Sequence, residues 1–140
     1  MNNLHKNKTI ILFDGECAMC NNYILFVAKN DSDDNFRFLS IQNKKIIELK
    51  KTHAVQEDNI SSICIIDNNK IKRKSKAVLK ILSMLKFPYN LLIVFYVIPS
   101  FLRDIIYDLV AKNRYRIFGK VDECSIVKKH ANLIQDKLID

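Results

Sequence analysis

Two cysteines three positions apart, Cys17 and Cys20, follow a short β-type run and constrain this chain more than any other feature. The run Thr9–Phe13 is apolar and β-rich, as in a buried central strand, and an Asp-Gly pair ends it. Over residues 18–29 the apolar positions recur at helical spacing. The cysteine pair is therefore predicted to lie at a strand–turn–helix junction.

Such a junction has a chemical consequence for the first cysteine. Cys17 is expected at the start of the helix, beside unpaired backbone N–H groups and the positive end of the helix dipole, a setting that favours the reactive thiolate. Cys20 falls on the same helix face, within reach of a disulfide. The expected cycle is attack by Cys17 on a substrate disulfide and resolution of the mixed disulfide by Cys20. Glu16 and Ala18 are expected to leave room for access to Cys17.

The next part of the chain alternates strands and helices. We expect a strand at 36–39, a helix at 44–51, a strand at 62–66, a hairpin partner at 70–74 and a helix at 76–86 capped by Ser75. A helix joins the first two strands, so they are expected to be parallel. The order β-α-β-α-β-β-α predicts an α/β, thioredoxin-like fold with a central mixed four-stranded sheet flanked by helices.

The carboxy-terminal third is predicted to be mostly helical. The apolar stretch 91–98 is shorter than the roughly 18–20 residues that a membrane span needs, and 100–113 has apolar residues at every third or fourth position. We expect the two to form a helical hairpin packed on the core. No repeat or linker divides the chain, which predicts one domain over 1–140, with a core at about 9–86 and a helical extension at about 89–140.

The formal net charge of +8 raises the question of an anionic partner. Basic residues are spread along the whole chain, and the densest stretch, 70–76, alternates as on the exposed side of a strand and turn. No nucleic-acid-binding motif accompanies it. We therefore expect no nucleic-acid partner and no transmembrane span. A weak association with a membrane surface, through the apolar 91–98 region and nearby basic residues, stays open.

The cysteine content and the amino terminus bear on the compartment. Residues 1–9 are polar, and the apolar run after them is too short for the core of a signal peptide. Four cysteines in 140 residues do not resemble a small disulfide-stapled scaffold. We therefore expect a cytoplasmic protein, in which a close cysteine pair indicates redox chemistry or metal binding.

Metal binding in a non-catalytic module is the main alternative. A CxxC pair can be static or half of a zinc site, and Cys124 and His130 could complete a Cys₃His set. Cys64 lies within an apolar run, where a buried core thiol is the simpler interpretation. The strand–CxxC–helix context favours redox chemistry. We therefore expect no metal and no cofactor.

Three charged residues are further candidates. Asp14 could accept the proton of Cys20, or its side chain could cap the turn into the helix. Arg114 and Arg116, together with Tyr115 between them, could form a cationic patch near the cysteines, or the arginines could complement the dipole at the end of their own helix. The sequence alone leaves these alternatives open.

Two blocks of sequence together resemble a known family. Residues 14–20, DGECAMC, resemble the DGxCxxC signature of the DCC family of thiol–disulfide oxidoreductases. Residues 107–119, YDLVAKNRYRIFG, with Asp122 and Cys124 after them, are similar to the carboxy-terminal YDxVAxNRYRxFG and Asp-x-Cys pattern of that family. The serine-led helix start at Ser75 is also similar, and the resemblance runs from about residue 10 to 124.

The resemblance implies a thioredoxin-like redox domain of bacterial type. The catalytic residues that its motifs mark are Cys17, Cys20 and Asp14. Possible accessory residues are Gly15, Arg114, Arg116 and Cys124. Cys124 would be a third redox thiol or a buried small residue. The partners implied are a thiol or disulfide substrate, protein or small molecule, and an electron donor or acceptor. Thioredoxins proper also carry a cis-proline before the third strand, where this chain has Ser61 and Ser62.

Overall fold

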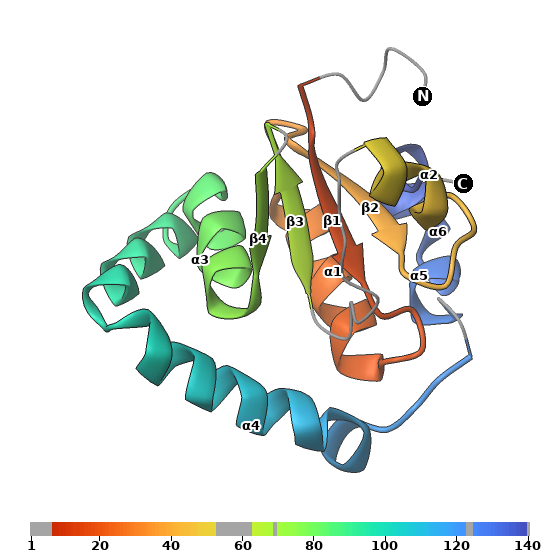
Figure 1. Ribbon diagram of the computed structural model, residues 1–140. Coiled ribbons are helices and arrows are strands. Elements are labelled where there is room, and N and C mark those ends of the chain that lie inside the picture. The colour runs from red at the N-terminus through yellow and green to blue at the C-terminus, as the bar shows by residue number, and fades with distance from the viewer. Residues whose placement is uncertain (1–6, 53–62, 69, 123–124, 140) are drawn as a thin grey trace.

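A four-stranded mixed sheet with helices on both faces forms the centre of the chain (Figure 1). The structure, a computed structural model, describes residues 7–52, 63–68, 70–122 and 125–139. Its elements are β1 (Thr9–Phe13), α1 (Ala18–Asn30), β2 (Phe36–Ser40), α2 (Ile46–Thr52), β3 (Cys64–Asp67), β4 (Lys70–Arg73), α3 (Lys74–Met84), η2 (Tyr89–Val97), α4 (Ser100–Phe118), α5 (Ser125–Lys129), α6 (Ala131–Ile134) and η3 (Gln135–Lys137).

The strands follow the order β2-β1-β3-β4. β1 pairs with β2 in parallel, while β1 with β3 and β3 with β4 are antiparallel. The parallel pair follows from α1, which carries the chain from the end of β1 back to the start of β2. This arrangement confirms the predicted α/β, thioredoxin-like fold with a mixed sheet flanked by helices.

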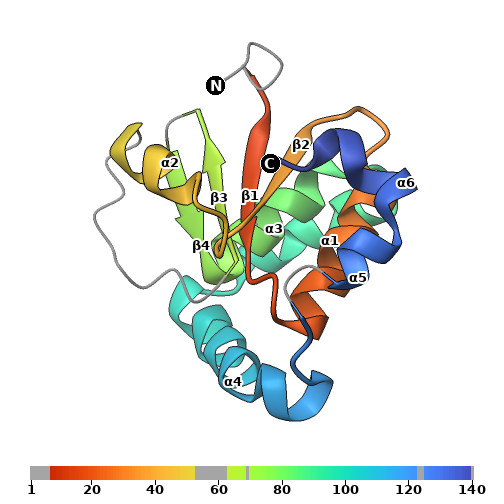
Figure 2. The same ribbon diagram turned by 90° about the vertical axis from the view of Figure 1, so that its right-hand side faces the viewer.

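Side chains alternate along β1 and divide the core into two layers. Ile11 and Phe13 pack with residues of α1 and α3 on one face of the sheet, including the fully buried Ile24 and Ile81. Ile10 and Leu12 point to the opposite face and join a second cluster that includes Leu49 of α2 and Cys64 of β3. Figure 2 shows α1 and α3 on one side of the sheet and α2 on the other.

The end of the chain returns to this core. α5 and α6 lie beside α1 (Figure 2), and Ile134 of α6 is fully buried in the cluster between α1 and the sheet. Beyond η3, the Ile139 N–H donates a hydrogen bond of 2.9 Å to the carbonyl of Phe38 in β2. Residues after α4 therefore contribute Ile134 and Ile139 to the buried core.

Two local predictions about helix ends were wrong. Ser75 does not cap α3: the helix begins at Lys74, and the Ser75 hydroxyl donates instead to the carboxylate of Asp104 in α4. The helix predicted to end at 113 continues as α4 to Phe118, so it also carries Arg114, Tyr115 and Arg116.

The predicted packing of the apolar carboxy-terminal segments on the core was wrong for most of their side chains. η2 and α4 run along one end of the domain, against α3 (Figure 1), and leave most of their apolar residues in solvent. The side of α4 that faces the domain makes polar contacts, and Lys74 of α3 lies 3.0 Å from Asp108 there. Among the described helices, none is long and apolar enough to cross a membrane.

Candidate active site

The two cysteines occupy the predicted junction. Cys17 is the N-cap residue of α1, and its Sγ accepts a hydrogen bond of 3.3 Å from the backbone N–H of Cys20. Asn21, fully buried in the first turn of the helix, donates from Nδ2 to the carbonyls of Gly15 and Cys17 at 2.8 and 2.9 Å. The turn around the cysteines is thus held from inside by a residue that sequence reasoning missed, although Asn21 lies one helical turn after Cys17.

Asp14, at the end of β1, is buried and fully engaged. Its Oδ1 accepts hydrogen bonds from the Glu16 N–H at 3.0 Å and from Nε2 of Gln42 at 2.8 Å. Its Oδ2 accepts from the Tyr115 hydroxyl and from the Arg114 guanidinium, the latter at 3.2 Å. The contact with Glu16 is the turn cap that the sequence left open as one of two alternatives.

The charge state of Asp14 follows from these contacts. Burial raises the pKa of the carboxyl, but the hydrogen bonds from Tyr115, Gln42 and the Glu16 N–H and the charge of Arg114 outweigh it. The pKa of Asp14 therefore lies below its ordinary value. At neutral pH the group is a buried, fixed negative charge.

Cys20 is held in the opposite state. Burial raises the pKa of its thiol, and the hydrogen bond to Cys17, the charge on Cys17 and the charge of Asp14 raise it further, against a smaller lowering effect of Arg114. A cysteine in such surroundings keeps its proton at neutral pH.

Of the two arginine candidates, the structure brings only one to the site. Arg114 is buried and ion-paired with Asp14 across 3.2 Å. Arg116 is exposed, because two residues along a helix turn the side chain by about 200° to the other face. Two further side chains bind Asp14: Gln42, just after β2, which sequence reasoning missed, and Tyr115, which the sequence had grouped with the two arginines.

Access to Cys17 differs from the prediction. Cys17 has no exposed surface and Cys20 is 3% exposed. The segment after α4 covers them: Gly119, whose φ of +85° suits glycine, accepts from the Ala18 N–H at 3.4 Å, and the Val121 N–H donates to the Glu16 carbonyl at 2.9 Å. Neighbouring Glu16 and Ala18 leave no opening because their backbones pair with this segment.

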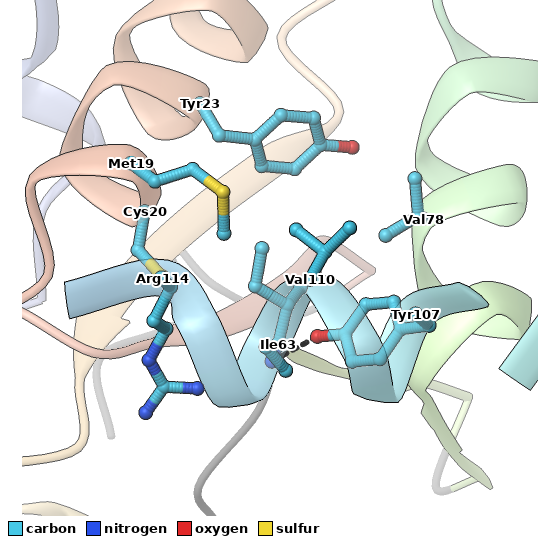
Figure 3. Close-up of a pocket in the computed structure, with 9 residues that line it drawn as sticks. Met19, Cys20, Tyr23, Ile63, Val78, Tyr107, Val110 and Arg114 are labelled. Atoms are coloured by element: carbon cyan, nitrogen blue, oxygen red, sulfur yellow. Dashed lines mark hydrogen bonds between the residues drawn. The ribbon is translucent and has the colours of Figure 1, made fainter. Parts of the chain in front are cut away.

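A pocket of about 150 Å³ lies beside Cys20, between α1 and α4 (Figure 3). Its almost wholly apolar wall is formed by Met19, Cys20, Tyr23, Ile63, Val78, Tyr107, Val110, Ala111 and Arg114. The Tyr107 hydroxyl accepts a hydrogen bond of 3.0 Å from the Ile63 N–H, the dashed line in Figure 3. Burial raises the pKa of the Tyr23 hydroxyl, which has no hydrogen-bond partner among the described residues.

The residues of the alternative zinc site do not come together in the part of the chain that the structure describes, where no three His, Cys, Asp or Glu side chains converge. His130 is exposed, with Nδ1 2.9 Å from the Ile126 carbonyl. Cys64 is buried in the core, as its apolar run indicated. Cys124 lies outside the described residues, so its predicted accessory role has no structural counterpart here.

Fold and site together define a class: a thioredoxin-like α/β protein with a CxxC pair at a helix N-terminus. The chain belongs to the DCC1-like thiol-disulfide oxidoreductase family, which it matches over residues 11–120. It is 35% identical over 117 residues to the uncharacterized protein YuxK of Bacillus subtilis (strain 168), covering 84% of this chain and 85% of YuxK. It is 37% identical over 120 residues to the chloroplastic DCC family protein At1g52590 of Arabidopsis thaliana, covering 85% of this chain and 70% of that protein. No solved structure matches the chain.

Proposed function

We propose that this chain exchanges thiols and disulfides through Cys17 as nucleophile and Cys20 as resolving thiol. The observation that carries the proposal is the asymmetry of the pair. The Cys17 sulfur sits at the N-terminus of α1 and accepts a hydrogen bond from the Cys20 N–H, while the raised pKa of Cys20 keeps that thiol protonated. The position of Cys17 at the N-terminus of α1 makes it the sulfur that reacts first, and the Cys20 thiol keeps its proton until the second step.

The exchange transfers two electrons from the cysteine pair to the substrate disulfide. The Cys17 thiolate attacks one sulfur of the substrate disulfide, forms a mixed disulfide and releases the other substrate sulfur as a thiolate. Cys20 then gives its proton to the substrate thiolate just released and attacks the Cys17 sulfur. This second step forms the Cys17–Cys20 disulfide, releases the remaining substrate thiolate and leaves the substrate reduced. An external thiol then reduces the Cys17–Cys20 disulfide back to the dithiol. If an oxidant takes the place of that thiol, the pair is kept oxidised, and the same steps run in reverse and oxidise a dithiol substrate.

Asp14 acts in this proposal as a positioning residue with a fixed charge. A general base works best when its pKa lies near the working pH, whereas the pKa of Asp14 is held below that of an ordinary carboxyl. Its charge raises the pKa of Cys20, while the charge of Arg114 acts in the opposite direction. Asp14 also ties β1, α4 and the turn to one another through Arg114 and Glu16.

Substrate access in this proposal requires that the 119–121 segment move off the cysteines. Two backbone hydrogen bonds and the exposed Lys120–Glu16 ion pair of 3.3 Å hold the segment there, and an exposed ion pair contributes little. The apolar pocket beside Cys20 offers a place for an apolar group of the substrate next to the reacting sulfurs. The proposed substrate is thus a thiol or disulfide with such a group close to sulfur.

The test is a redox titration of the whole chain in glutathione buffers, with the thiols alkylated and weighed by mass spectrometry. The chain is expected to change by two electrons between a dithiol and a Cys17–Cys20 disulfide. Cys20→Ser is expected to stop at a mixed disulfide of Cys17 with glutathione, and Cys17→Ser to form none at position 20. Cys64→Ala, with its change in the opposite core layer, serves as the matched control and is expected to titrate like the parent chain.

Two results would contradict the proposal. One is a Cys17–Cys20 pair that stays reduced throughout the titration. The other is stoichiometric zinc in protein purified without chelator and lost in Cys17→Ser, which would establish the structural metal site instead. We place this chemistry in a reducing, cytoplasmic compartment; trapping the thiols in intact cells tests it, and a wholly oxidised pair would contradict it.

A further inference from the structure

η2 and α4 expose many large apolar side chains to solvent. From residue 87 to 102 the sequence has no charged residue. Large apolar side chains stand exposed along both elements; the outer face, as we call this set, comprises Leu91, Ile93, Val94, Phe95, Val97, Phe101, Leu102, Ile105, Ile106 and Leu109. Phe101 and Leu109 are each 64% exposed. Exposed apolar side chains gathered on two consecutive elements are typical of an interaction site.

The orientation of α4 is fixed by polar contacts on its inner side. Asp104 accepts a hydrogen bond from the Ser75 hydroxyl, and Asp108 pairs with Lys74 at the start of α3. Tyr107 bonds the Ile63 N–H, and Arg114 pairs with Asp14. Rotating the helix to bury its apolar side would break all of these contacts. The polar contacts on the inner side of α4 therefore keep the outer face turned toward solvent.

The charges at the edge of the outer face are positive. Ile105, Leu109, Lys112 and Arg116 follow one another at i, i+4, i+7 and i+11, so they share one side of α4. Both cations are exposed, and within the described residues neither makes an ion pair. The acidic residues of the helix, by contrast, lie on its inner side. A partner surface that is complementary to the outer face is therefore apolar in its interior and anionic at its boundary.

We propose that the outer face docks on the interface of a membrane that contains anionic lipids. α4 would lie in the plane of the surface with Ile105 and Leu109 between the acyl chains and with Lys112 and Arg116 among the phosphates. The long stems of the cations suit that depth. The uncharged stretch enters the interface without crossing it, in keeping with the lack of a spanning helix among the described residues.

A second copy of the chain fits this face less well. With the two α4 helices parallel, Lys112 and Arg116 would meet the same cations of the partner across the interface. With the helices antiparallel, they would meet the apolar start of α4 around Phe101. Each arrangement buries positive charge without a counter-charge, which costs free energy. Anionic headgroups supply that counter-charge.

The experiment is flotation of the full chain with lipid vesicles, and it reads lipid binding without any redox step. Phosphatidylglycerol–phosphatidylcholine vesicles are expected to carry the protein at low salt, and binding is expected to weaken as salt screens the charges. Pure phosphatidylcholine vesicles are expected to bind it more weakly. Lys112→Glu combined with Arg116→Glu is expected to lower the partition coefficient on anionic vesicles by about 25-fold or more, since each cation contributes about fivefold.

Apolar substitutions and a matched control complete the test. Ile105→Ser with Leu109→Ser is expected to lower partitioning at least about tenfold on both kinds of vesicle. Ile47→Ser, which removes an equally exposed isoleucine from α2 on the far side of the sheet, is expected to leave it unchanged. Circular dichroism checks that each variant is folded. Failure of the parent chain to float with anionic vesicles at low salt overturns the proposal, and so does a lipid-free dimer that Ile105→Ser with Leu109→Ser dissociates.

Discussion

The two sides of α4 differ from those of an ordinary surface helix in which one faces the domain and which one faces solvent. Its inner side carries Asp104, Tyr107, Asp108 and Arg114, each bonded to the domain, whereas its outer side carries exposed isoleucine and leucine. Ordinary surface helices bury the apolar side. The comparison teaches that polar contacts hold this helix in place and leave its apolar side exposed. The same inner side brings Arg114 to the cysteine site.

The largest contrast is expected between the core and the outer face. Ile81→Ala empties a fully buried position of α3 and is expected to lower the free energy of unfolding by about 2–5 kcal/mol. Leu109→Ala on the outer face is expected to change it by no more than about 0.5 kcal/mol. Urea unfolding of the two variants measures both values. Equal losses would mean that α4 is buried in the protein in solution.

Next in size is the ion pair that links α4 to the site. Arg114→Met leaves the buried carboxylate of Asp14 without its cation and is expected to cost about 3 kcal/mol of unfolding free energy. Arg116→Met, the same change two residues further on, removes an exposed side chain and is expected to stay within about 0.5 kcal/mol. Denaturant titrations of both proteins make the comparison. An equal cost for the two would refute the idea that polar contacts anchor this end of the helix.

A smaller effect separates two tyrosines of one pocket. Tyr107→Phe leaves the buried Ile63 N–H without its acceptor and is expected to cost about 1–2 kcal/mol of unfolding free energy. Tyr23→Phe removes a buried hydroxyl that has no partner among the described residues, and it is expected to be neutral or slightly stabilising. Unfolding curves recorded side by side test the pair. A larger loss for Tyr23→Phe would speak against the polar anchoring of α4.

The smallest expected effect is on the pH dependence of stability. The pKa of Asp14 is lower in the folded than in the unfolded chain, where it is about 3.9. Its ionised form therefore stabilises the fold above that unfolded value, and this contribution is lost as pH falls toward the folded pKa. Asp34, an exposed residue whose pKa is lowered by hydrogen bonds from Arg37 and Lys137, adds to the same acid loss.

The variant Asp14→Asn separates the contribution of Asp14 to this pH dependence from that of Asp34. The variant is expected to be less stable than the parent chain at neutral pH, and the difference between them is expected to shrink as pH falls below about 4. Urea unfolding at several pH values between neutral and acid gives the difference. A gap that stays constant with pH would show that the ionisation of Asp14 does not stabilise the fold.

Sequence pattern was sufficient wherever the structure rests on local rules. The run at 9–13, the Asp-Gly turn and the helix after Cys17 are encoded by β-branched residues, turn formers and helical periodicity, all within a few positions. Parallel pairing of β1 with β2 follows from the intervening helix. The position of both cysteines at this junction could therefore be predicted. So could the fold, whose element order is compatible with few topologies.

Tertiary structure decided what depends on distant segments. The partners of Asp14 come from positions 42, 114 and 115, and Cys17 is covered by 119–121, so neither its charge environment nor its burial could be inferred from the CxxC motif. Periodicity identified the apolar side of α4 but not the direction in which it points. That direction is set by polar partners on α3 and just after β1, because a hydrophobic pattern specifies a face and only the packed neighbours determine what that face meets.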